Sequence, residues 1–316
     1  MTLAARKTTL SLCVALAITV SALPAPAHGW WALGHMLVAE IALRHLKPEV
    51  ARTVQRYSAR LSESGPFPKT PDFVQMSAWA DDLKGYGLTE MGGWHYTNKM
   101  YVHGNHTTTV NTEKKPNVET ALRSHVKALK RSDAPPYVLQ FALANVAHFY
   151  GDIHQPLHTT AMVSAKHPKG DRGGNDVSVM FRGRKMNLHA VWDSMCDGGE
   201  FDPERPLSAS SYEKVRDIAS DLLSRYNFSE KEKTQTNPSV MVGEGYQLAK
   251  TVVYDGVDNN TVLTDEYITK CRDTVQSRVT LAGHRLATQL NDVFSAPGVA
   301  LESSLIYFLR FFDFFF

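Results

Sequence analysis

Two pairs of histidine and aspartate have a spacing that suits a metal site. His148 and Asp152 are four residues apart, and so are His189 and Asp193. On a helix, side chains at positions i and i+4 lie on one face with their Cβ atoms about 5–6 Å apart, so both can reach one cation. Both pairs lie in apolar stretches, where an aspartate buried without a partner is strongly destabilising. A bound metal removes that penalty, so the pairs predict a metal-binding core.

The candidate ligands are more numerous than one ion needs. Imidazole nitrogen and carboxylate oxygen both bind zinc, and a zinc site without cysteine is more often catalytic than structural. The candidates are His35, Asp81, His95, His148, Asp152, His158, His189 and Asp193. Shared among sites of three ligands, they imply two or three ions. Metals about 3.5–4 Å apart suit phosphate-ester hydrolysis, because they stabilise both the attacking and the leaving oxygen.

Most of the chain has the apolar spacing of helices. Helical periodicity covers residues 36–46, 118–129, 138–153, 211–226, 240–253 and 273–290. Residues 175–181 alternate instead, and the following Arg182-Gly183-Arg184 predicts a turn, so we expect one small β-hairpin. There is no internal repeat and no linker long enough to separate domains. The sequence therefore predicts a single, mainly α domain that positions the ligands.

The first residues are typical of an export signal. Arg6 and Lys7 precede an apolar run over residues 10–22, and small residues at Ala27 and Gly29 suit a cleavage site. The run is shorter than the roughly 20 residues of a membrane span, although an uncleaved anchor helix is the alternative. We expect residues 1–29 to be removed, which makes Trp30 the new N-terminus. The mature protein would then be secreted, at the cell surface or in the lumen of the secretory pathway.

Composition agrees with export and limits how nucleic acid could bind. Without the two basic residues of the leader, 32 acidic residues balance the same number of Lys and Arg, so nucleic acid would bind through local groups and not through a basic face. Cys13 leaves with the leader, and Cys196 and Cys271 remain as the expected disulfide. Sequons at Asn105, Asn227 and Asn259 fit a secreted surface.

The C-terminal residues have no assigned role. Residues 305–316 are rich in phenylalanine, but the stretch is short and contains Arg310 and Asp313, which argues against a membrane span. The segment could cover an apolar surface, contact a membrane weakly or be a sequence irregularity. We therefore expect a leader at 1–29, a catalytic domain at 30–297 and a tail at 298–316.

Six motifs occur in an order that resembles a known family. They are Trp30-Trp-Ala-Leu-Gly-His35, Trp79-Ala-Asp81, Trp94-His95, the block from His148 to His158, Gly173-Gly-Asn175, and Asn187-Leu-His189 with Trp192-Asp193. In this order the chain resembles the S1/P1 nucleases, three-zinc enzymes that cleave single-stranded nucleic acid, and particularly the 3′-nucleotidase/nucleases of trypanosomatids. A fainter match occurs at residues 281–287. The resemblance implies a single-domain helical fold of the phospholipase C/P1 nuclease type.

The resemblance also implies how three zinc ions are held. One would be bound by Asp81, His95, His148 and Asp152. Its neighbour would be bound by the α-amino group and carbonyl oxygen of Trp30, by His35, and by Asp152 as a bridge. The third would be bound by His158, His189 and Asp193. The amine of Trp30 is free only after cleavage, so this site could not be completed in the precursor.

Catalytic and substrate-binding roles follow from the same resemblance. Asp81 would orient the attacking water, Lys84 would meet the developing negative charge, and the third zinc would stabilise the leaving 3′-oxygen, which gives 5′-phosphorylated products. Tyr96 would stack on a base, a contact of about 1–3 kcal/mol that requires an unstacked base. Asn98 would bind the base edge, and Asn175 is a further substrate contact. The substrates would be single-stranded nucleic acid and 3′-nucleotides, with no stable protein partner implied and a monomer expected.

Two other functions are compatible with these motifs. A zinc phospholipase C would share the fold, the N-terminal tryptophan and the three zincs, although Asp81 with Lys84, and Tyr96 with Asn98, fit the nuclease pattern. A secreted zinc binder without activity is the other alternative, but no ligand position is missing.

His154 lies two residues after Asp152, so we expect it to point away from the ligand face. Trp79, Trp94 and Trp192 flank ligands, and we expect them to pack the site.

Overall fold

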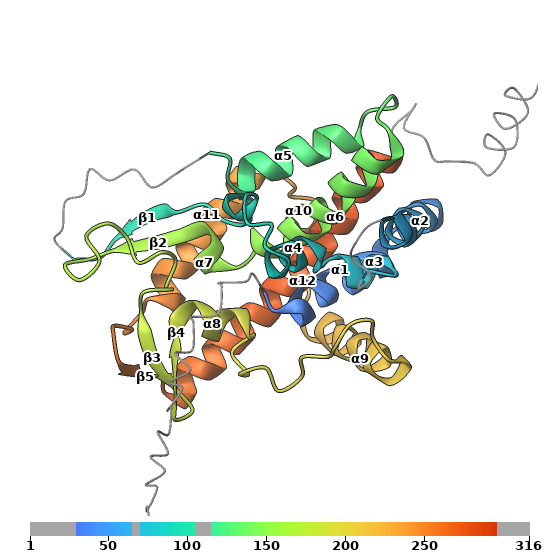
Figure 1. Cartoon of the computed structure of the whole chain (residues 1–316). Helices are drawn as coiled ribbons and strands as arrows, with labels where there is room; N and C mark the ends of the chain where they lie inside the picture. The colour runs from blue at the N-terminus through green and yellow to red at the C-terminus, as the bar shows by residue number, and fades with distance from the viewer. Residues whose placement is uncertain (1–29, 65–69, 105–114, 296–316) are drawn as a thin grey trace, which may run out of the picture.

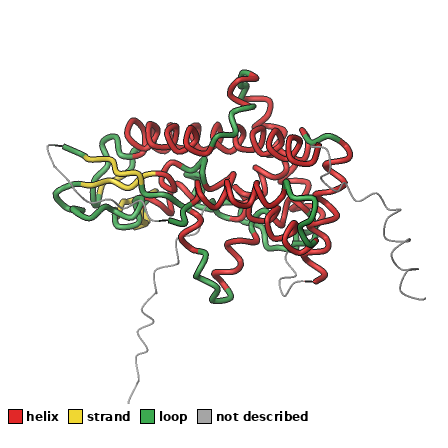
Figure 2. Tube along the Cα trace, turned by 90° about the horizontal axis from the view of Figure 1, so that it is seen from above, coloured by secondary structure: helices red, strands yellow, loops and turns green. Residues whose placement is uncertain are grey.

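The computed structural model describes residues 30–64, 70–104 and 115–295. The expected leader and the C-terminal tail lie outside these residues. Within them the protein is mainly helical, with its short strands gathered at one end of the helical body (Figures 1 and 2). The expected fold class is confirmed. None of the described helices combines the length and the apolar character that a bilayer span requires.

Three long helices form the centre of the molecule. They are α1 (Ala32–His45), α6 (Pro136–Asp152) and α12 (Asp265–Ser295), and α1 packs against both others. In α1, every residue from 33 to 42 is buried, and α6 is buried from residue 142 to its end. Helices that are apolar on all sides occupy cores, and these two carry candidate ligands from the centre of the core.

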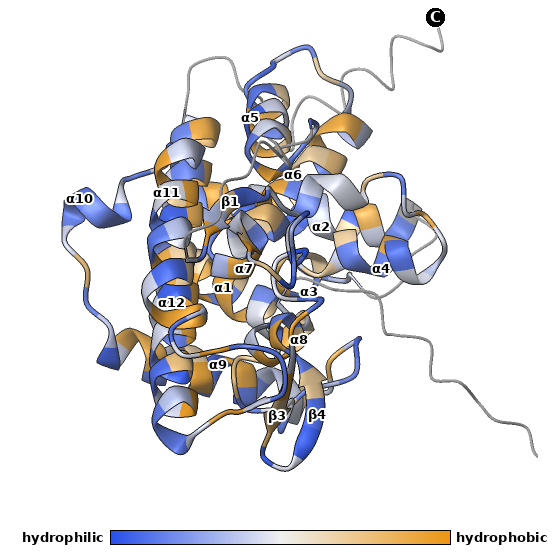
Figure 3. Cartoon of the chain, turned by 90° about the vertical axis from the view of Figure 1, so that its left-hand side faces the viewer, coloured by the Kyte–Doolittle hydropathy of each residue, from blue (hydrophilic) through white to orange (hydrophobic). Residues whose placement is uncertain are grey.

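Other helices surround this core. Helix α2 (Pro48–Ser64) and α5 (Val118–Leu129) pack against α6, and α9 (Ala209–Arg225) packs against α1. Helix α5 begins at a capping box in which Asn117 and Thr120 exchange hydrogen bonds. Short α10 (Glu230–Lys233) has no buried residue and lies at the periphery, coloured as hydrophilic in Figure 3.

Short helices carry the remaining candidate ligands toward the core. They are α3 (Phe73–Met76), α4 (Trp79–Gly85), a 3₁₀ helix (Gly92–His95), α7 (Pro156–Thr159) and α8 (Leu188–Asp193). Asn187 caps α8 by accepting a hydrogen bond from the Ala190 amide at 2.6 Å. Helix α11 (Pro238–Leu248) packs against α7. Ligands from distant parts of the sequence thereby meet at one place.

The strands form two small sheets. The expected hairpin is present as β3 (Ser178–Phe181) and β4 (Arg184–Asn187), paired antiparallel. Two-residue β5 (Thr261–Val262) joins β3 in parallel, and β1 (Lys99–Val102) pairs in parallel with β2 (Thr160–Val163). We had not expected these parallel pairs, because each joins segments that are remote in sequence and have no turn signal between them.

Two helix boundaries differ from the expected ones. The stretch expected as one helix at 240–253 is α11 followed by a π-helical turn at Ala249–Val253. The helix expected at 273–290 begins at Asp265 and runs for 31 residues. In its first turns only Ile268 and Cys271 are buried, and charged residues lie between and around them. Two apolar positions are too few to give a helical periodicity, so the sequence did not predict this part of the helix. The expected disulfide between Cys196 and Cys271 is present and links the segment after α8 to this extension.

Candidate active site

The eight candidate side-chain ligands converge in the interior. Within the described residues, three groups have donor atoms that all lie within 4.8 Å of one another. The groups are His35 with His148 and Asp152; Asp81 with His95 and His148; and His158 with His189 and Asp193. Helix α6 supplies His148 and Asp152 from the same face, as their spacing predicted. Helix α8 does the same with His189 and Asp193.

Four donor atoms lie at separations close to those between the ligands of one zinc ion. They are Oδ1 of Asp81, Nδ1 of His95, Nε2 of His148 and Oδ2 of Asp152. The separations between these atoms lie between 3.0 and 3.7 Å for all pairs except the two carboxylates. A zinc ion with bonds of about 2.1 Å holds tetrahedral donors about 3.4 Å apart. The four residues expected to hold the first zinc therefore fit that ion.

Asp152 faces two groups at once. Its Oδ2 lies 3.0 Å from His95 Nδ1, while its Oδ1 lies 3.7 Å from Nε2 of His35. The imidazole rings of His35 and His148 stack, with centroids 3.8 Å apart. The two oxygens of this carboxylate thus face different donor sets.

Several buried donor atoms at this centre have no hydrogen-bond partner. They are both ring nitrogens of His35, Oδ1 of Asp152 and Nε2 of His158. Leaving a buried polar atom unsatisfied costs about 1–3 kcal/mol, and more when the group is charged. A set of such atoms on imidazole and carboxylate groups fits bound cations, because coordination would satisfy one nitrogen of His35, Oδ1 of Asp152 and Nε2 of His158. The residues present therefore suit zinc.

Backbone carbonyls hold three of the imidazoles in the orientation of metal ligands. Nδ1 of His148 donates to the Ser77 carbonyl at 2.7 Å, Nδ1 of His158 to that of His95 at 2.8 Å, and Nδ1 of His189 to that of Gly173 at 2.6 Å. With a proton on Nδ1, each ring turns Nε2 toward its cluster, where a bound cation would take the place of any proton on that nitrogen. Such outer contacts are typical of histidine ligands, and a sequence without coordinates does not reveal which carbonyl is used.

Charge around the centre keeps a negatively charged carboxylate in the interior. Burial alone would raise the pKa of Asp152, but His148 and His158 outweigh burial and hold the pKa well below its usual range. Burial, and then the charge of Lys84, lower the pKa of His95 to about 4, so its ring is neutral at pH 7. Burial opposes a charge on His158, yet the Asp152 carboxylate raises its pKa to about 9. The cluster attracts positive charge.

Trp30 packs against this centre. Its indole is fully buried and donates from Nε1 to the carbonyl of Gly151 at 2.9 Å, directly before Asp152. The next amide, of Trp31, donates to the Asp193 carbonyl at 3.1 Å. A Cβ on Gly151 would lie 2.6 Å from Nδ1 of His35, so the absence of a side chain lets α6 approach α1 here. The first described residue thus lies beside two candidate ligands.

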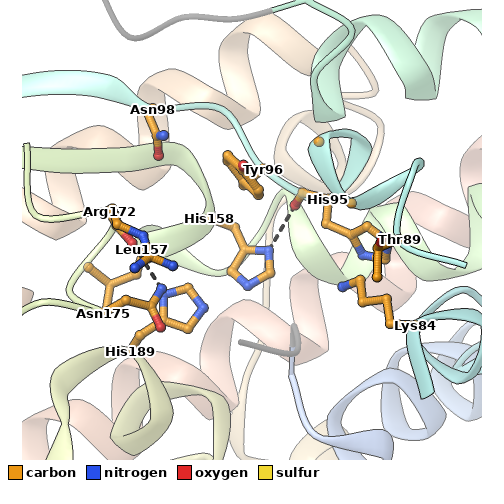
Figure 4. A pocket seen from close by; sticks show the side chains of 12 residues that line it. Lys84, Thr89, His95, Tyr96, Asn98, Leu157, His158, Arg172, Asn175 and His189 are labelled. Carbon is orange, nitrogen blue, oxygen red and sulfur yellow. Dashed lines mark hydrogen bonds between the residues drawn. The ribbon is translucent and has the colours of Figure 1, made fainter. Parts of the chain in front are cut away.

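A pocket of about 550 Å³ opens above the metal centre (Figure 4). Its lining includes the predicted substrate contacts Tyr96, Asn98 and Asn175, together with His95, His158 and His189. The Tyr96 ring is 44% exposed, so one face can receive a flat group. Lys84 also lines the pocket, and its ammonium group donates to Oδ1 of Asp81 at 2.7 Å. A substrate in this pocket would rest on the donor clusters.

Two residues at the site were not singled out from the sequence. Gln155 is buried and donates from Nε2 to Oδ1 of Asp193 at 2.7 Å. It lies inside the block from His148 to His158, so its place in that motif was an available signal. Arg172 lines the pocket directly before Gly173-Gly174-Asn175, and its exposed position in a loop carried no signal of its own.

Residues expected to lie outside the ligand sets do so. His154 is turned away from the clusters: Nδ1 donates to the Tyr150 carbonyl at 2.7 Å, and Nε2 accepts from Arg285 at 3.1 Å. Trp192 donates to the hydroxyl of Tyr267, and Trp79 packs edge-on against Phe141. Trp94 packs in the same way against His125. These tryptophans contribute packing around the site.

The sequons have different surroundings. Asn227 is exposed, whereas Asn259 accepts a hydrogen bond from the Ser178 amide at 2.9 Å and contacts His167 at 3.1 Å. Asn105 lies outside the described residues. Glycosylation at these positions stays a prediction.

Comparison with known proteins agrees with the site. The family model described as S1/P1 Nuclease matches residues 30–295. Endonuclease 2 of Arabidopsis thaliana is 31% identical over 285 residues, covering 84% of this chain and 91% of the relative. Nuclease P1 of Penicillium citrinum is 26% identical over 84% of this chain and 97% of its own. Nuclease S1 of Aspergillus oryzae is 24% identical, with coverage of 85% and 93%. The chain therefore belongs to the S1/P1 nuclease family, hydrolases that cleave phosphodiester bonds.

Proposed function

We propose that this nuclease is a secreted, zinc-dependent endonuclease that hydrolyses single-stranded RNA and DNA to 5′-phosphorylated products and also releases phosphate from 3′-mononucleotides. The observation that carries the proposal is the set of buried, unpartnered donor atoms of His35, Asp152 and His158 beneath a pocket. The relatives of this chain are named as nucleases and endonucleases, which favours the nuclease function over a phospholipase C. A closer relation to the trypanosomatid branch stays a prediction.

Three zinc ions would occupy the three donor sets. The first would bind Asp81, His95, His148 and Asp152, whose imidazole nitrogens lie 3.0–3.7 Å from each other and from the carboxylate oxygens. The second would bind His35, Asp152, and the amine and carbonyl of Trp30. The third would bind His158, His189 and Asp193. Zinc bound here supplies Lewis-acid stabilisation of phosphate oxygens and a water whose pKa falls to about 7.

Asp81 and Lys84 have the positions for the chemical step. Burial would raise the pKa of Asp81, but Lys84, then His148 and His95, hold it below its usual range. The ionised carboxylate can therefore accept a hydrogen bond from the attacking water and orient it toward phosphorus. The Lys84 ammonium lies at the pocket surface beside it and would stabilise negative charge that develops on the phosphate oxygens.

Tyr96 supports the preference for single strands. Its partly exposed ring lies in the pocket wall near Asn98 and Asn175. A base can stack on this ring only when it has left its own stack, which is the normal state of a single strand. Asn98 offers both a donor and an acceptor to the base edge. Asn175 donates from Nδ2 to the Arg172 carbonyl at 2.9 Å, so its amide oxygen would be the group that contacts substrate.

A product analysis tests the proposal. Purified mature protein should cleave single-stranded RNA and DNA into fragments with 5′-phosphate ends and should release phosphate from 3′-AMP but not from 5′-AMP. Duplex DNA and phosphatidylcholine serve as comparison substrates. Hydrolysis of phosphatidylcholine without cleavage of nucleic acid would overturn the proposal, and fragments with 3′-phosphate ends would overturn the assignment of the leaving oxygen.

A further inference from the structure

A strained loop presents Arg172 to the pocket. Arg172 has a φ of 55°, in the left-handed region that non-glycine residues seldom adopt. Hydrogen bonds hold the loop in this shape: Oδ1 of Asp171 accepts from the amides of Met162 and Gly173 at 2.8 and 3.1 Å. The Arg172 carbonyl accepts from Asn175 at 2.9 Å. Strain that surrounding contacts maintain beside a site is a reason to look for a role in function.

The same loop is tied to the metal centre. The carbonyl of Gly173, the next residue, accepts the hydrogen bond from Nδ1 of His189 at 2.6 Å. A Cβ on Gly173 would lie 2.4 Å from the carbonyl oxygen of Leu157, so the loop lies directly against the segment that carries His158. The backbone of Arg172 is therefore placed relative to the third donor set by short contacts, and its side chain starts from a defined position.

The guanidinium group of Arg172 is available to a ligand. Its side chain is 73% exposed and has a long contact, 3.5 Å, with the exposed carboxylate of Asp176. Exposed ion pairs of this kind are worth little and are readily exchanged for a better partner. Arg172 lines the pocket together with Asn175 and His189 (Figure 4). A planar guanidinium matches the oxygens of a phosphate group well.

Arg172 and Lys84 mark different sides of the pocket. In Figure 4, Lys84 lies on the side of His95 and Arg172 on the side of His189. The described lining holds these two permanent cations and no carboxylate. Lys84 is engaged by Asp81 and is 11% exposed, whereas Arg172 extends into solvent. Two cations so placed suit a strand with more than one phosphate.

We propose that Arg172 binds the 5′-phosphate of the nucleoside whose 3′-oxygen is released. This inference rests on the proposed function, in which His158, His189 and Asp193 lie on the side of the leaving 3′-oxygen. The 5′-phosphate of that nucleoside extends beyond them, where the loop presents Arg172. The contact exists only when the nucleoside carries a 5′-phosphate, so Arg172 makes the site favour polynucleotides over minimal substrates.

A pair of dinucleotides isolates this contact. ApA and pApA share the scissile bond and the bases, and differ only in the 5′-phosphate of the leaving nucleoside. Arg172→Asn removes the cation with a residue that tolerates the left-handed backbone. The ratio of kcat/KM for pApA to kcat/KM for ApA should fall about tenfold in this variant, the value of one charged hydrogen bond. Arg172→Lys should restore part of the ratio.

Arg182→Asn is the matched control. Arg182 also has a left-handed φ, of 47°, and an exposed side chain, which pairs with Glu200 at 2.8 Å. The pApA to ApA ratio should not change in that variant. An unchanged ratio in Arg172→Asn, or an equal loss on both dinucleotides as for a contact with the base, would overturn the inference while leaving the nuclease function intact. A wild-type enzyme that cleaved single-stranded RNA but did not prefer pApA to ApA would overturn the inference alone, whereas one that cleaved neither RNA nor 3′-AMP would overturn the proposed function, and this inference with it.

Discussion

The chemistry of single residues here depends on where each imidazole places its proton. His148, His158 and His189 all donate from Nδ1 to a backbone carbonyl. Each ring is thereby held in one tautomer with Nε2 toward the cluster. Two of these carbonyls belong to residues with no chemistry of their own, Ser77 and Gly173. The site is therefore built as much from main chain as from the side chains that a motif reveals.

His148→Ala tests the metal assignment. His148 belongs to two of the three donor groups, so its loss should reduce hydrolysis of single-stranded RNA by more than about a hundredfold, beyond the usual effect of losing an outer contact. Zinc content, measured by mass spectrometry of the purified protein, should fall below the proposed three ions per chain. His103→Ala is the control, because His103 is exposed and outside the pocket lining. Full activity in His148→Ala would contradict the assignment.

Gln155→Met tests the outer contact on Asp193. The substitution keeps the approximate size of the side chain but removes two hydrogen bonds: the one from Nε2 to Oδ1 of Asp193, and the one that Oε1 accepts from the Leu157 amide at the start of α7. We expect zinc to leave the third site about 10–100 times more readily in a chelator titration. The circular dichroism spectrum should stay that of the wild type. Chelator resistance equal to that of the wild type would show that Gln155 only packs against its neighbours.

At the scale of elements, the long helix α12 links the core to the segment between the ligands of α6 and α7. Arg278 donates from Nε to the carbonyl of His154 at 3.2 Å, and Arg285 contacts the His154 ring. Both arginines also pair with Glu244 of α11. The turn that separates Asp152 from His158 is therefore held from behind by α12. Helix α12 reaches this position only because it packs closely on α1.

Gly283→Ala tests that close packing. A Cβ at this position would lie 2.5 Å from Cγ2 of Ile41 and 3.0 Å from the carbonyl oxygen of Val38 on α1. We expect a loss of about 1–3 kcal/mol in the free energy of unfolding, as for other overpacked cores, measured by urea denaturation. Gly243→Ala in α11 is the control, because its added Cβ would meet nothing within 4 Å. There the better helix propensity of alanine should stabilise by about 0.5–1 kcal/mol. Equal effects at both positions would contradict the packing argument.

At the scale of the whole molecule, Trp30 and Trp31 attach the first described residues to the candidate site. The Trp30 indole is anchored to Gly151, and the following amide to Asp193. Both anchors lie beside candidate ligands of different donor sets. The start of the folded domain is thus part of the wall of the site. Removal of the leader would free an amine in the place where the proposed second zinc needs one.

One extra residue before Trp30 tests this connection. An amide nitrogen is a poor metal ligand compared with an amine, so the extended protein should lose at least about tenfold in activity. Its zinc content should fall by one ion, while its thermal unfolding should remain cooperative. Mass spectrometry must confirm that the extra residue is retained. Full activity in the intact extended protein would exclude the amine as a ligand.

Local spacing in the sequence was sufficient for part of this protein. The pairs His148 with Asp152 and His189 with Asp193 lie on one helix face because i and i+4 always do. The helices at 118–129 and 138–153 and the hairpin after residue 175 follow from periodicity and turn residues, since these depend on neighbours in the chain. The mainly α class and the order of the motifs follow from the same local signals.

Other features were decided only by tertiary structure. Each of the following contacts joins segments that are remote in sequence. Asp81 meets His95 and His148, and β1 pairs in parallel with β2. The carbonyls of Ser77 and Gly173 accept hydrogen bonds from His148 and His189. No local pattern specifies which remote groups come into contact, because that depends on how whole helices pack. The orientation of Arg172 is also decided by tertiary structure. No sequence pattern distinguishes this exposed arginine from others, and only the folded loop directs its side chain to the pocket.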